Sequence, residues 1–269
     1  MEFTGYFASI LMGLTLGLIG GGGSILTVPI LVYLFSIVPT LATTYSLFIV
    51  GLTAFFGGLR YYKKGEVDLK TAFLFAIPSF SGVYLTRHFL LPALPDPVFD
   101  LIQIPVSKSL LIMVLFSILM VFASFSMIKE KKQSQQLDET GSQQKILLVF
   151  LKGLFVGGVT GFVGAGGGFL IIPALVLLIG LPMRRAVGTS LSIIAFNSLL
   201  GFIGDIRHQV LIDWKLLMTL STLALLGLQL GIRLNNKIPE KTLKKNFGYF
   251  VLIMGSLILF DQIRRQIQH

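Results

Sequence analysis

The chain has 269 residues, of which 54% are hydrophobic and only 13% are charged, whereas about a quarter of residues are charged in soluble domains. This composition excludes an ordinary soluble protein and indicates a membrane protein. The absence of cysteine excludes disulfides, thiolate catalysis and cysteine-based metal sites. A net charge of +10 would suit a nucleic-acid partner, but Lys and Arg fall in short loops between apolar runs, where membrane topology explains them and no nucleic acid is expected.

The first apolar run, residues 3–35, is too long for one straight helix across a bilayer. At 1.5 Å per residue it would extend roughly 50 Å, against a hydrocarbon core of about 30 Å. Residues 20–23 are all glycine, and each glycine costs a helix about 1 kcal/mol relative to alanine, so the helix is expected to break there. We therefore predict a helical hairpin, with one helix over residues 3–19 and a shorter one over 25–36.

The rest of the chain divides into two parts of similar layout. Transmembrane helices are predicted over residues 41–59, 70–91 and 107–128, which complete a first transmembrane repeat over 1–128. Residues 129–145 are polar and rich in Gln and Ser, so we interpret them as a cytoplasmic linker. The second transmembrane repeat, 146–269, has a predicted helix over 146–163, a short helix over 169–179, and further helices over 185–204, 214–233 and 242–261.

Six positions recur 144 residues apart in the two parts. They are Gly13, Gly17, Gly20, Gly22, Gly23 and Pro29 in the first, and Gly157, Gly161, Gly164, Gly166, Gly167 and Pro173 in the second. We call residues 20–24 the first glycine knot and residues 164–168 the second. A hairpin plus three helices crosses the membrane an odd number of times, so the second copy is expected to be inverted. The predicted fold is an all-α polytopic membrane protein of two inverted repeats, each a glycine-broken helical hairpin plus three transmembrane helices.

The loop charges agree with this topology. Segments 60–70, 129–145 and 233–245 carry most of the Lys and Arg residues and would fall on one side of the membrane. The positive-inside rule makes that side cytoplasmic and places both termini outside. The predicted location is the cell (inner) membrane, with the chain crossing several times.

Inverted repeats with interrupted helices are typical of secondary transporters, whose substrate binds near the midplane. Non-helical backbone is tolerated at that depth only where it is buried in protein or lines a cavity. Short helices that begin near Ser24 and Phe169 would direct positive N-terminal ends at an anion. No charged residue lies at the centre of a predicted helix, since Arg87 and Asp205 are near helix ends. The predicted site therefore uses amides and hydroxyls, with no metal, cofactor or catalytic residue.

The candidate substrate-binding residues are the two knots and the nearest hydroxyl or amide side chains. In the first repeat they are Gly20, Gly21, Gly22, Gly23, Ser24, Thr15, Thr44 and Ser46. In the second they are Gly164, Gly166, Gly167, Gly168, Thr160, Thr189, Ser190 and Asn197. Glycines spaced by four, as at 13 and 17 or 153, 157 and 161, instead favour close helix packing. Ser and Thr inside a membrane often bond to their own helix, and Asn197 is equally suited to joining two helices.

The repeated pattern Gly-xxx-Gly-xx-Gly-x-Gly-Gly followed by proline resembles the TauE/SafE family, also called the sulfite exporter or TSUP family. The resemblance covers essentially the whole chain. It implies a bacterial or archaeal permease, often counted as eight spans, that moves sulfite, sulfonates or other small sulfur-containing anions. By position, the family's knots correspond to Gly20, Gly22 and Gly23 and to Gly164, Gly166, Gly167 and Gly168.

The predicted function is a secondary transporter, an exporter or permease, for a small sulfur-containing anion such as sulfite or an organosulfonate. It would work by alternating access around the knots, within the lipid bilayer and in a monomer or homo-oligomer. The alternatives are an anion channel and a non-transporting membrane scaffold. A hydrolase with Ser24 as nucleophile would need a nearby base, and His88, His208 and His269 lie near membrane surfaces or in the tail. A dinucleotide loop at residues 164–168 would need a βαβ unit.

Overall fold

Helices account for nearly all of this computed structural model, which describes residues 2–95, 99–101, 104–128, 142–163, 168–206 and 212–267. The first part contains α1 (Glu2–Ile19), α2 (Gly22–Pro29), η1 (Ile30–Leu34), α3 (Pro39–Lys63), α4 (Leu69–Leu85), η2 (Thr86–Leu90), α5 (Leu91–Ala93) and α6 (Lys108–Ile128), where η marks a π-helical segment. The second contains α7 (Ser142–Val163), α8 (Gly168–Pro173), η3 (Ala174–Leu178), α9 (Met183–Ile206), α10 (Trp214–Asn235) and α11 (Glu240–Ile267). Two short antiparallel strands that the sequence patterns did not predict, β1 (Phe99–Leu101) and β2 (Ile104–Val106), lie between α5 and α6.

Among the described residues, four helices have the length and composition needed to cross a membrane: Pro39–Lys63, Leu69–Ala93, Met183–Ile206 and Trp214–Asn235. Shorter apolar helices are Thr4–Ile19, Gly23–Leu34, Leu110–Phe122, Leu147–Phe162 and Gly248–Gln262. Large side chains such as Phe73, Phe122 and Phe155 are exposed on the outside, as expected for a surface that faces lipid. The predicted fold class is confirmed: the chain is an all-α polytopic membrane protein.

The first predicted hairpin breaks at its glycines, but at fewer of them than expected. The helix α1 ends at Ile19, Gly20 takes the left-handed backbone conformation with φ +79°, and α2 begins at Gly22. Glycine is the residue that adopts this conformation without steric cost, so one such residue and Gly21 reverse the chain. The 8 residues of α2 and the 5 of η1 extend about 20 Å, which is short of a hydrocarbon core of about 30 Å. The turn therefore lies inside the bilayer if the hairpin enters from one surface.

The two hairpins share a second feature after their prolines. The π-helical segments η1 and η3 directly follow Pro29 and Pro173. Proline has no N–H for the carbonyl one turn back, and its ring crowds that carbonyl, so a locally widened turn relieves both problems. Two residues after each segment ends, the chain has a residue with positive φ, Ser36 at 55° and Gly180 at +80°. The 144-residue repeat thus extends from sequence to backbone conformation.

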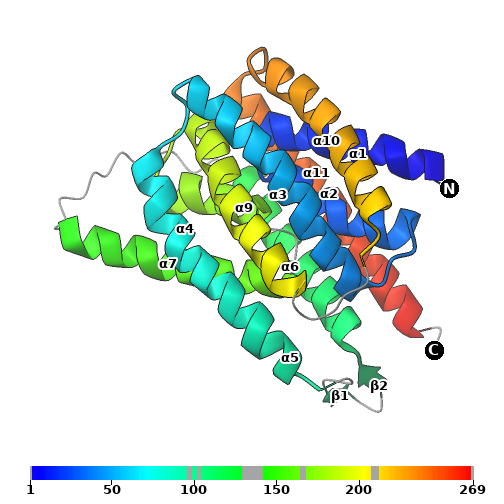
Figure 1. Cartoon of the computed structure of the whole chain (residues 1–269). Helices are drawn as coiled ribbons and strands as arrows, with labels where there is room; N and C mark the ends of the chain where they lie inside the picture. Colours follow the sequence, from blue (N-terminus) through cyan, green and yellow to red (C-terminus); the bar gives the residue numbers. More distant parts are fainter. Residues whose placement is uncertain are drawn as a thin grey trace.

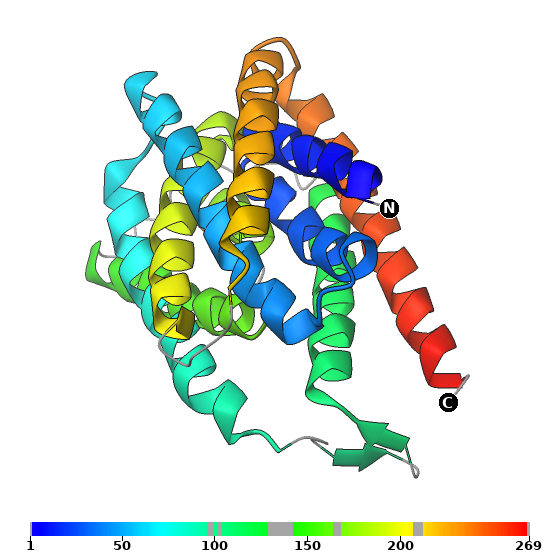
Figure 2. The same cartoon turned by 45° about the vertical axis from the view of Figure 1, so that its right-hand side comes forward.

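The helices of the two parts pack in a reciprocal pattern (Figures 1 and 2). The first helix of each part packs against the fourth α-helix of the other, so that α1 crosses α10 and α7 crosses α4. Elsewhere, corresponding helices of the two parts pack against each other, α3 against α9 and α6 against α11. Of the four long helices, α3 and α9 are the most enclosed, and they lie at the centre of the bundle. An approximate two-fold relation between the repeats would produce this pattern.

Glycines make the reciprocal crossings close. A Cβ atom on Gly13 would overlap the Ala224 carbonyl of α10, and one on Gly157 would overlap the Ser79 carbonyl of α4. The same equivalence holds for Gly17 with Leu228, Gly161 with Val83, Gly227 with Ile10 and Gly82 with Leu154. The structure therefore gives the glycines spaced by four a packing role, because their missing side chains let the helix backbones touch.

The two ends of the bundle differ in their loops. The α3–α4 and α10–α11 connections lie together at the top of Figure 1, and Lys64 Nζ donates to Asn236 Oδ1 between them at 3.3 Å. Arg60 and Lys63 in the last turn of α3 and Lys237 in the α10–α11 connection are basic, so we call this the basic end. The β1–β2 hairpin lies at the opposite end, which we call the hairpin end. The central helices α3 and α9 run between the two ends in opposite directions.

Candidate functional site

The first glycine knot lies where the two halves of the protein meet. A Cβ atom on Gly20 would come within 2.7 Å of Ser190 Oγ and 3.1 Å of the Val187 carbonyl, both on α9, and 3.1 Å of Ile172 Cδ1 on α8. Gly20 is buried, and Ser190 is completely buried. The knot of the first repeat and the predicted hydroxyl of the second are therefore in direct contact. A glycine is required here both by the backbone conformation and by the space.

The other residues of this knot have separate local roles. The Gly21 carbonyl accepts hydrogen bonds from the Ser24 amide at 3.2 Å and from Ser24 Oγ at 2.6 Å. Gly22 and Gly23, predicted as part of the turn, instead belong to the first turn of α2. A Cβ atom on Gly23 would overlap the Met12 carbonyl, so this glycine lets α2 pack closely on α1. The non-helical part of the knot is therefore confined to Gly20 and Gly21.

The second knot falls largely outside the described residues, which exclude Gly164, Gly166 and Gly167. Gly168 is the first residue of α8. Because α8 packs against α2, the helices that follow the two knots are neighbours. The place of the second knot itself remains a prediction from the 144-residue repeat.

Most predicted hydroxyl groups bond within their own helices. Thr15 Oγ1 donates to the Met12 carbonyl at 2.8 Å, Thr160 Oγ1 to Gly157 at 3.0 Å, and Ser190 Oγ to Val187 at 2.8 Å. Such bonds satisfy a hydroxyl without a partner from another element. Their acceptor lone pairs remain, but their protons are engaged. The hydroxyl protons of these three residues are therefore not free to bind a ligand in this arrangement.

Three further predicted residues join different helices or have a group with no partner. Thr189 Oγ1 accepts from the Asp68 amide at 2.9 Å, and Asn197 Nδ2 donates to Ser79 Oγ at 2.7 Å. Asn197 therefore joins α9 to α4, although its Oδ1 has no partner among the described residues. Ser46 Oγ is completely buried and also has no partner in the described part of the chain. Ser46 lies 144 residues before Ser190, the residue that touches the first knot.

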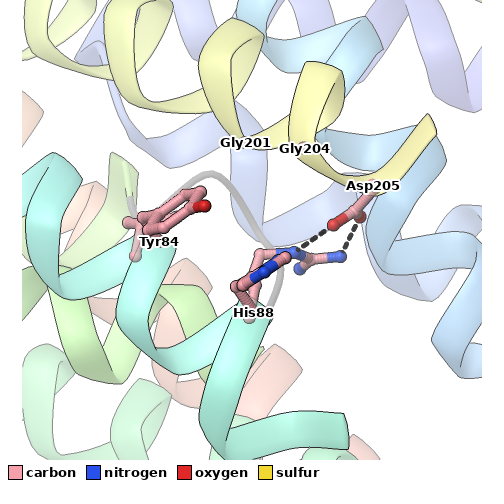
Figure 3. A pocket seen from close by; sticks show the side chains of 7 residues that line it. Tyr84, His88, Gly201, Gly204 and Asp205 are labelled. Atoms are coloured by element: carbon pink, nitrogen blue, oxygen red, sulfur yellow. Dashed lines mark hydrogen bonds and ion pairs between the residues drawn. The ribbon is translucent and has the colours of Figure 1, made fainter. Parts of the chain in front are cut away.

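Thr44 belongs to a charged cluster at the hairpin end, where it bonds Asp205, and Figure 3 shows Asp205 at the end of α9 in this cluster. Arg87 Nε donates to Asp205 Oδ1 at 2.9 Å, and the Arg87 Nη2 group contacts Asp205 Oδ2 as a second bond of the same ion pair. Thr44 Oγ1 donates to Asp205 Oδ2 at 2.7 Å. The Arg87 and Asp205 side chains are only 10% and 14% exposed. Arg87 Nη1 also donates to the Gly161 carbonyl at 3.4 Å, so the cluster links α3, η2, α7 and α9.

A pocket opens beside this ion pair. Its lining residues are Val83, Tyr84, Arg87, His88, Gly201, Gly204 and Asp205, so it lies between the α4–η2 helix and the end of α9. Figure 3 shows Tyr84 and His88 on one wall, and their rings stack with centroids 5.1 Å apart. Sequence reasoning placed Arg87 and Asp205 near helix ends but did not predict their pairing. One available signal was that both charges interrupt apolar segments on the side of the membrane that is poor in charge.

Comparison with known proteins agrees with the architecture. A family model described as Sulfite exporter TauE/SafE matches residues 6–258, a range that includes both glycine knots. The chain belongs to the TauE/SafE family. No solved structure matches it at a significant level.

The relatives of this TauE/SafE protein are named as transporters. A probable membrane transporter protein of Xylella fastidiosa (strain 9a5c) is 28% identical over 257 residues, which cover 93% of this chain and 92% of that protein. The probable membrane transporter protein YdhB of Bacillus subtilis (strain 168) is 27% identical, with 93% and 97% covered. MJ0441 of Methanocaldococcus jannaschii, which carries the same description, is 26% identical, with 93% and 94% covered. Together with the apolar helices, these matches identify a multi-pass membrane transporter.

Proposed function

We propose that this transporter is a secondary carrier that exports a small sulfur-containing anion, such as sulfite or an organosulfonate, across the cell (inner) membrane. The observation that carries the proposal is the contact between the two halves at Gly20. There a helix breaks, its backbone turns through a left-handed residue, and the turn rests on Ser190 of the opposite repeat. The substrate class is inferred from the family's description as sulfite exporters.

The mechanism would be alternating access, in which one half moves against the other around the two knots. Backbone at a helix break offers amides that a continuous helix would use internally, and these amides suit an anion. Gly20 contacts Val187 and Ser190, which lie in the first third of α9 at the basic end. By the repeat, the second knot would lie near Ser46 toward the hairpin end. The two knots would then line successive parts of one pathway through the centre of the bundle.

Energetics favour export of an anion without a coupling ion. A membrane potential that is negative inside drives each negative charge outward by about 2.3 kcal/mol per 100 mV. The knots supply neutral donors, which bind an anion less tightly than fixed positive charges and therefore permit its release. The Ser24 hydroxyl, which could be considered as a nucleophile, donates to its own turn at the Gly21 carbonyl. This arrangement supports a transport function over hydrolysis.

The test is flux in liposomes that contain the purified protein. Radiolabelled sulfite, sulfate and taurine would be measured with and without an imposed potential. Saturable, potential-dependent flux of one of these anions is the expected result. Large single-channel currents would instead indicate an anion channel, and no flux of any of the three would leave another small anion or a scaffold.

Two leucine substitutions make the test specific for the knot. Gly20→Leu places a side chain at φ +79° and against Ser190, so it should abolish saturable flux while the protein still inserts. Gly65→Leu is the matched control, because Gly65 has φ +73° but open space around its Cβ position. Gly167→Leu tests the second knot in the same way. Normal flux from both knot variants would remove the knots from the mechanism.

A further inference from the structure

The pocket at the hairpin end combines a buried guanidinium with space that packing does not require. Arg87 points its planar fork at Asp205, and the two bonds of the pair use Nε and Nη2. This bidentate geometry is the one that guanidinium groups also use for oxyanions such as phosphate and sulfate groups. A ligand with two oxygens at carboxylate spacing would therefore fit the same donors.

Gly204 supplies the space. It lies within α9, where alanine would be more stable, and a Cβ atom on it would meet no atom within 4 Å. Gly201, one turn earlier on the same wall, would place a Cβ 3.3 Å from Leu47 and so has a packing reason to be glycine. Gly204 has none among the described residues. The open volume next to it borders Arg87 and Asp205.

The local backbone also distinguishes this place. Arg87 lies in η2, a π-helical segment that is not preceded by proline, unlike η1 and η3. Single π-helical turns occur frequently at functional sites, because the widened turn redirects side chains. Here the redirected side chain crosses from η2 to α9 and to the Gly161 carbonyl of α7.

We propose that the Arg87 pocket is a second anion site on the transport pathway, where an oxyanion binds the Arg87 guanidinium in place of the Asp205 carboxylate. This inference rests on the proposed anion-transport function and adds to it a site at the hairpin end. Asp205 acts as an internal competitor that occupies Arg87 when no anion is present. Thr44, which bonds Asp205 Oδ2 at 2.7 Å, holds the carboxylate on the α3 side.

Replacement of the Asp205 carboxylate by an anion on Arg87 would also open the hairpin end. In the closed arrangement, Arg87 and Asp205 connect η2 to α9, and Thr44 and Gly161 extend the connection to α3 and α7. An anion on Arg87 frees Asp205 from its partner, so the link between η2 and α9 is lost. Arrival of the substrate and release of this end are therefore coupled, and the same guanidinium serves both steps.

The decisive experiment measures sulfite binding to the full-length protein in lipid nanodiscs, with chloride at equal ionic strength as the control. Trp214 is the only tryptophan of the chain and packs on Phe202 of α9 with ring centroids 6.2 Å apart, so its fluorescence reports on this end. Asp205→Asn removes the competing charge but keeps the side-chain size. We expect sulfite to bind this variant about tenfold more tightly than it binds the wild type, and to raise its melting temperature.

Two further variants separate an anion site from a purely structural ion pair. The double variant Arg87→Gln/Asp205→Asn should lose the sulfite-dependent stabilisation, because the guanidinium is gone. Gly204→Leu keeps the ion pair but fills the space beside it, so it should weaken sulfite binding. Ile203→Leu introduces the same residue at the neighbouring exposed position and should bind sulfite as the wild type does.

The possible failures are distinguishable. If sulfite binds Asp205→Asn no more tightly than wild type, or if the double variant keeps the stabilisation, the inference is wrong. Should Asp205→Asn fail to fold, unchanged sulfite affinity in Gly204→Leu overturns it instead. Failure of the proposed function is a different result, namely no saturable flux of any sulfur anion by wild-type protein in liposomes.

Discussion

The basic end and the hairpin end of the bundle are closed by different chemistry at equivalent positions. At the basic end, Tyr61 Oη donates to the Gly17 carbonyl at 3.0 Å. At the hairpin end, the Gly161 carbonyl, 144 residues later, accepts from Arg87 at 3.4 Å. The residue 144 positions after Tyr61 is Asp205, which pairs with that arginine. One end is therefore closed by a neutral hydroxyl and the other by an ion pair.

The packing also differs between the two closures: it is close around Tyr61 and leaves a pocket beside Arg87 and Asp205. Tyr61 is fully buried, and Gly188 allows the Glu66 carbonyl and the Tyr61 side chain to approach α9 closely. The position equivalent to Gly188 is Thr44, which bonds Asp205, and a pocket lies beside that cluster. The closure through Tyr61 is made by a hydroxyl whose proton is engaged, whereas the closure through Arg87 contains a guanidinium, a group that suits an anion. The difference teaches that positions 144 residues apart need not carry the same chemistry, so on the proposed pathway the two ends would respond differently to an anion.

The largest expected effect comes from removing only one of the two charges in the Arg87–Asp205 ion pair. Arg87→Leu leaves the mostly buried Asp205 carboxylate without its partner, which typically destabilises a protein by about 3–5 kcal/mol. We expect a lower melting temperature in nanodiscs and loss of saturable flux.

The control for this prediction removes both charges. Arg87→Leu/Asp205→Leu replaces the ion pair by apolar groups, which often restores stability because no charge remains buried alone. The double variant should regain most of the melting temperature but no flux. A double variant as unstable as the single one would show that the loss comes from packing around Arg87 and not from its charge.

A smaller loss of stability, of the same size at both places, is expected at the α1–α10 and α7–α4 crossings. Gly13→Ala and Gly157→Ala each force a methyl group against a carbonyl of the partner helix, and overpacking of this kind costs about 1–3 kcal/mol. Thermal unfolding of the two variants compares the crossings directly. Similar losses would show that the crossings are energetically equivalent, and a loss confined to one would limit the symmetry to geometry.

The sequence predicted those crossings because a local pattern encodes them. Glycines spaced by four, such as Gly13 and Gly17, can only form a smooth stripe on one helix face, so close packing follows without knowledge of the partner. The helix boundaries were predictable for the same reason, since apolar length and the glycine cluster at residues 20–23 are local signals. The turn was narrower than predicted because only Gly20 needs a left-handed backbone, after which Gly22 and Gly23 are helical.

The charged cluster could not be predicted in the same way. Arg87 and Asp205 lie 118 residues apart in sequence, and each residue alone reads as a charge at a helix end. Only the packing of η2 against α9 brings them together. The contact between Gly20 and Ser190 is intermediate, since both residues were candidates from the repeat but their direct contact depends on how the halves dock. Long-range pairing is therefore the part of the site that local patterns leave out.

Removing the neutral closure should have a moderate effect on stability and little on substrate affinity. Tyr61→Phe deletes the hydroxyl that donates to Gly17, and an unpaired buried carbonyl costs about 1–2 kcal/mol. Saturable flux should remain, with unchanged half-saturation by sulfite. Arg87→Lys is the contrasting variant at the other end, because an ammonium lacks the bidentate fork, and its half-saturation should rise. Equal effects of the two variants on half-saturation would remove the distinction between the ends.

The smallest effect is expected at the two helix caps, where the ends of the bundle are most alike. Asp68 caps α4 by accepting from the Thr71 amide at 2.9 Å, and Asp213 caps α10 by accepting from the Leu216 amide at 3.0 Å. Substitution of either by alanine should cost about 1 kcal/mol, measured as a fall in melting temperature. The two losses should add within about 0.5 kcal/mol in the double variant, because the caps are at opposite ends and share no partner. If the two losses of stability deviate from additivity by more than this, the two ends are coupled through α3 and α9 even without substrate. The closures at Tyr61 and at Arg87 would then not be independent of each other.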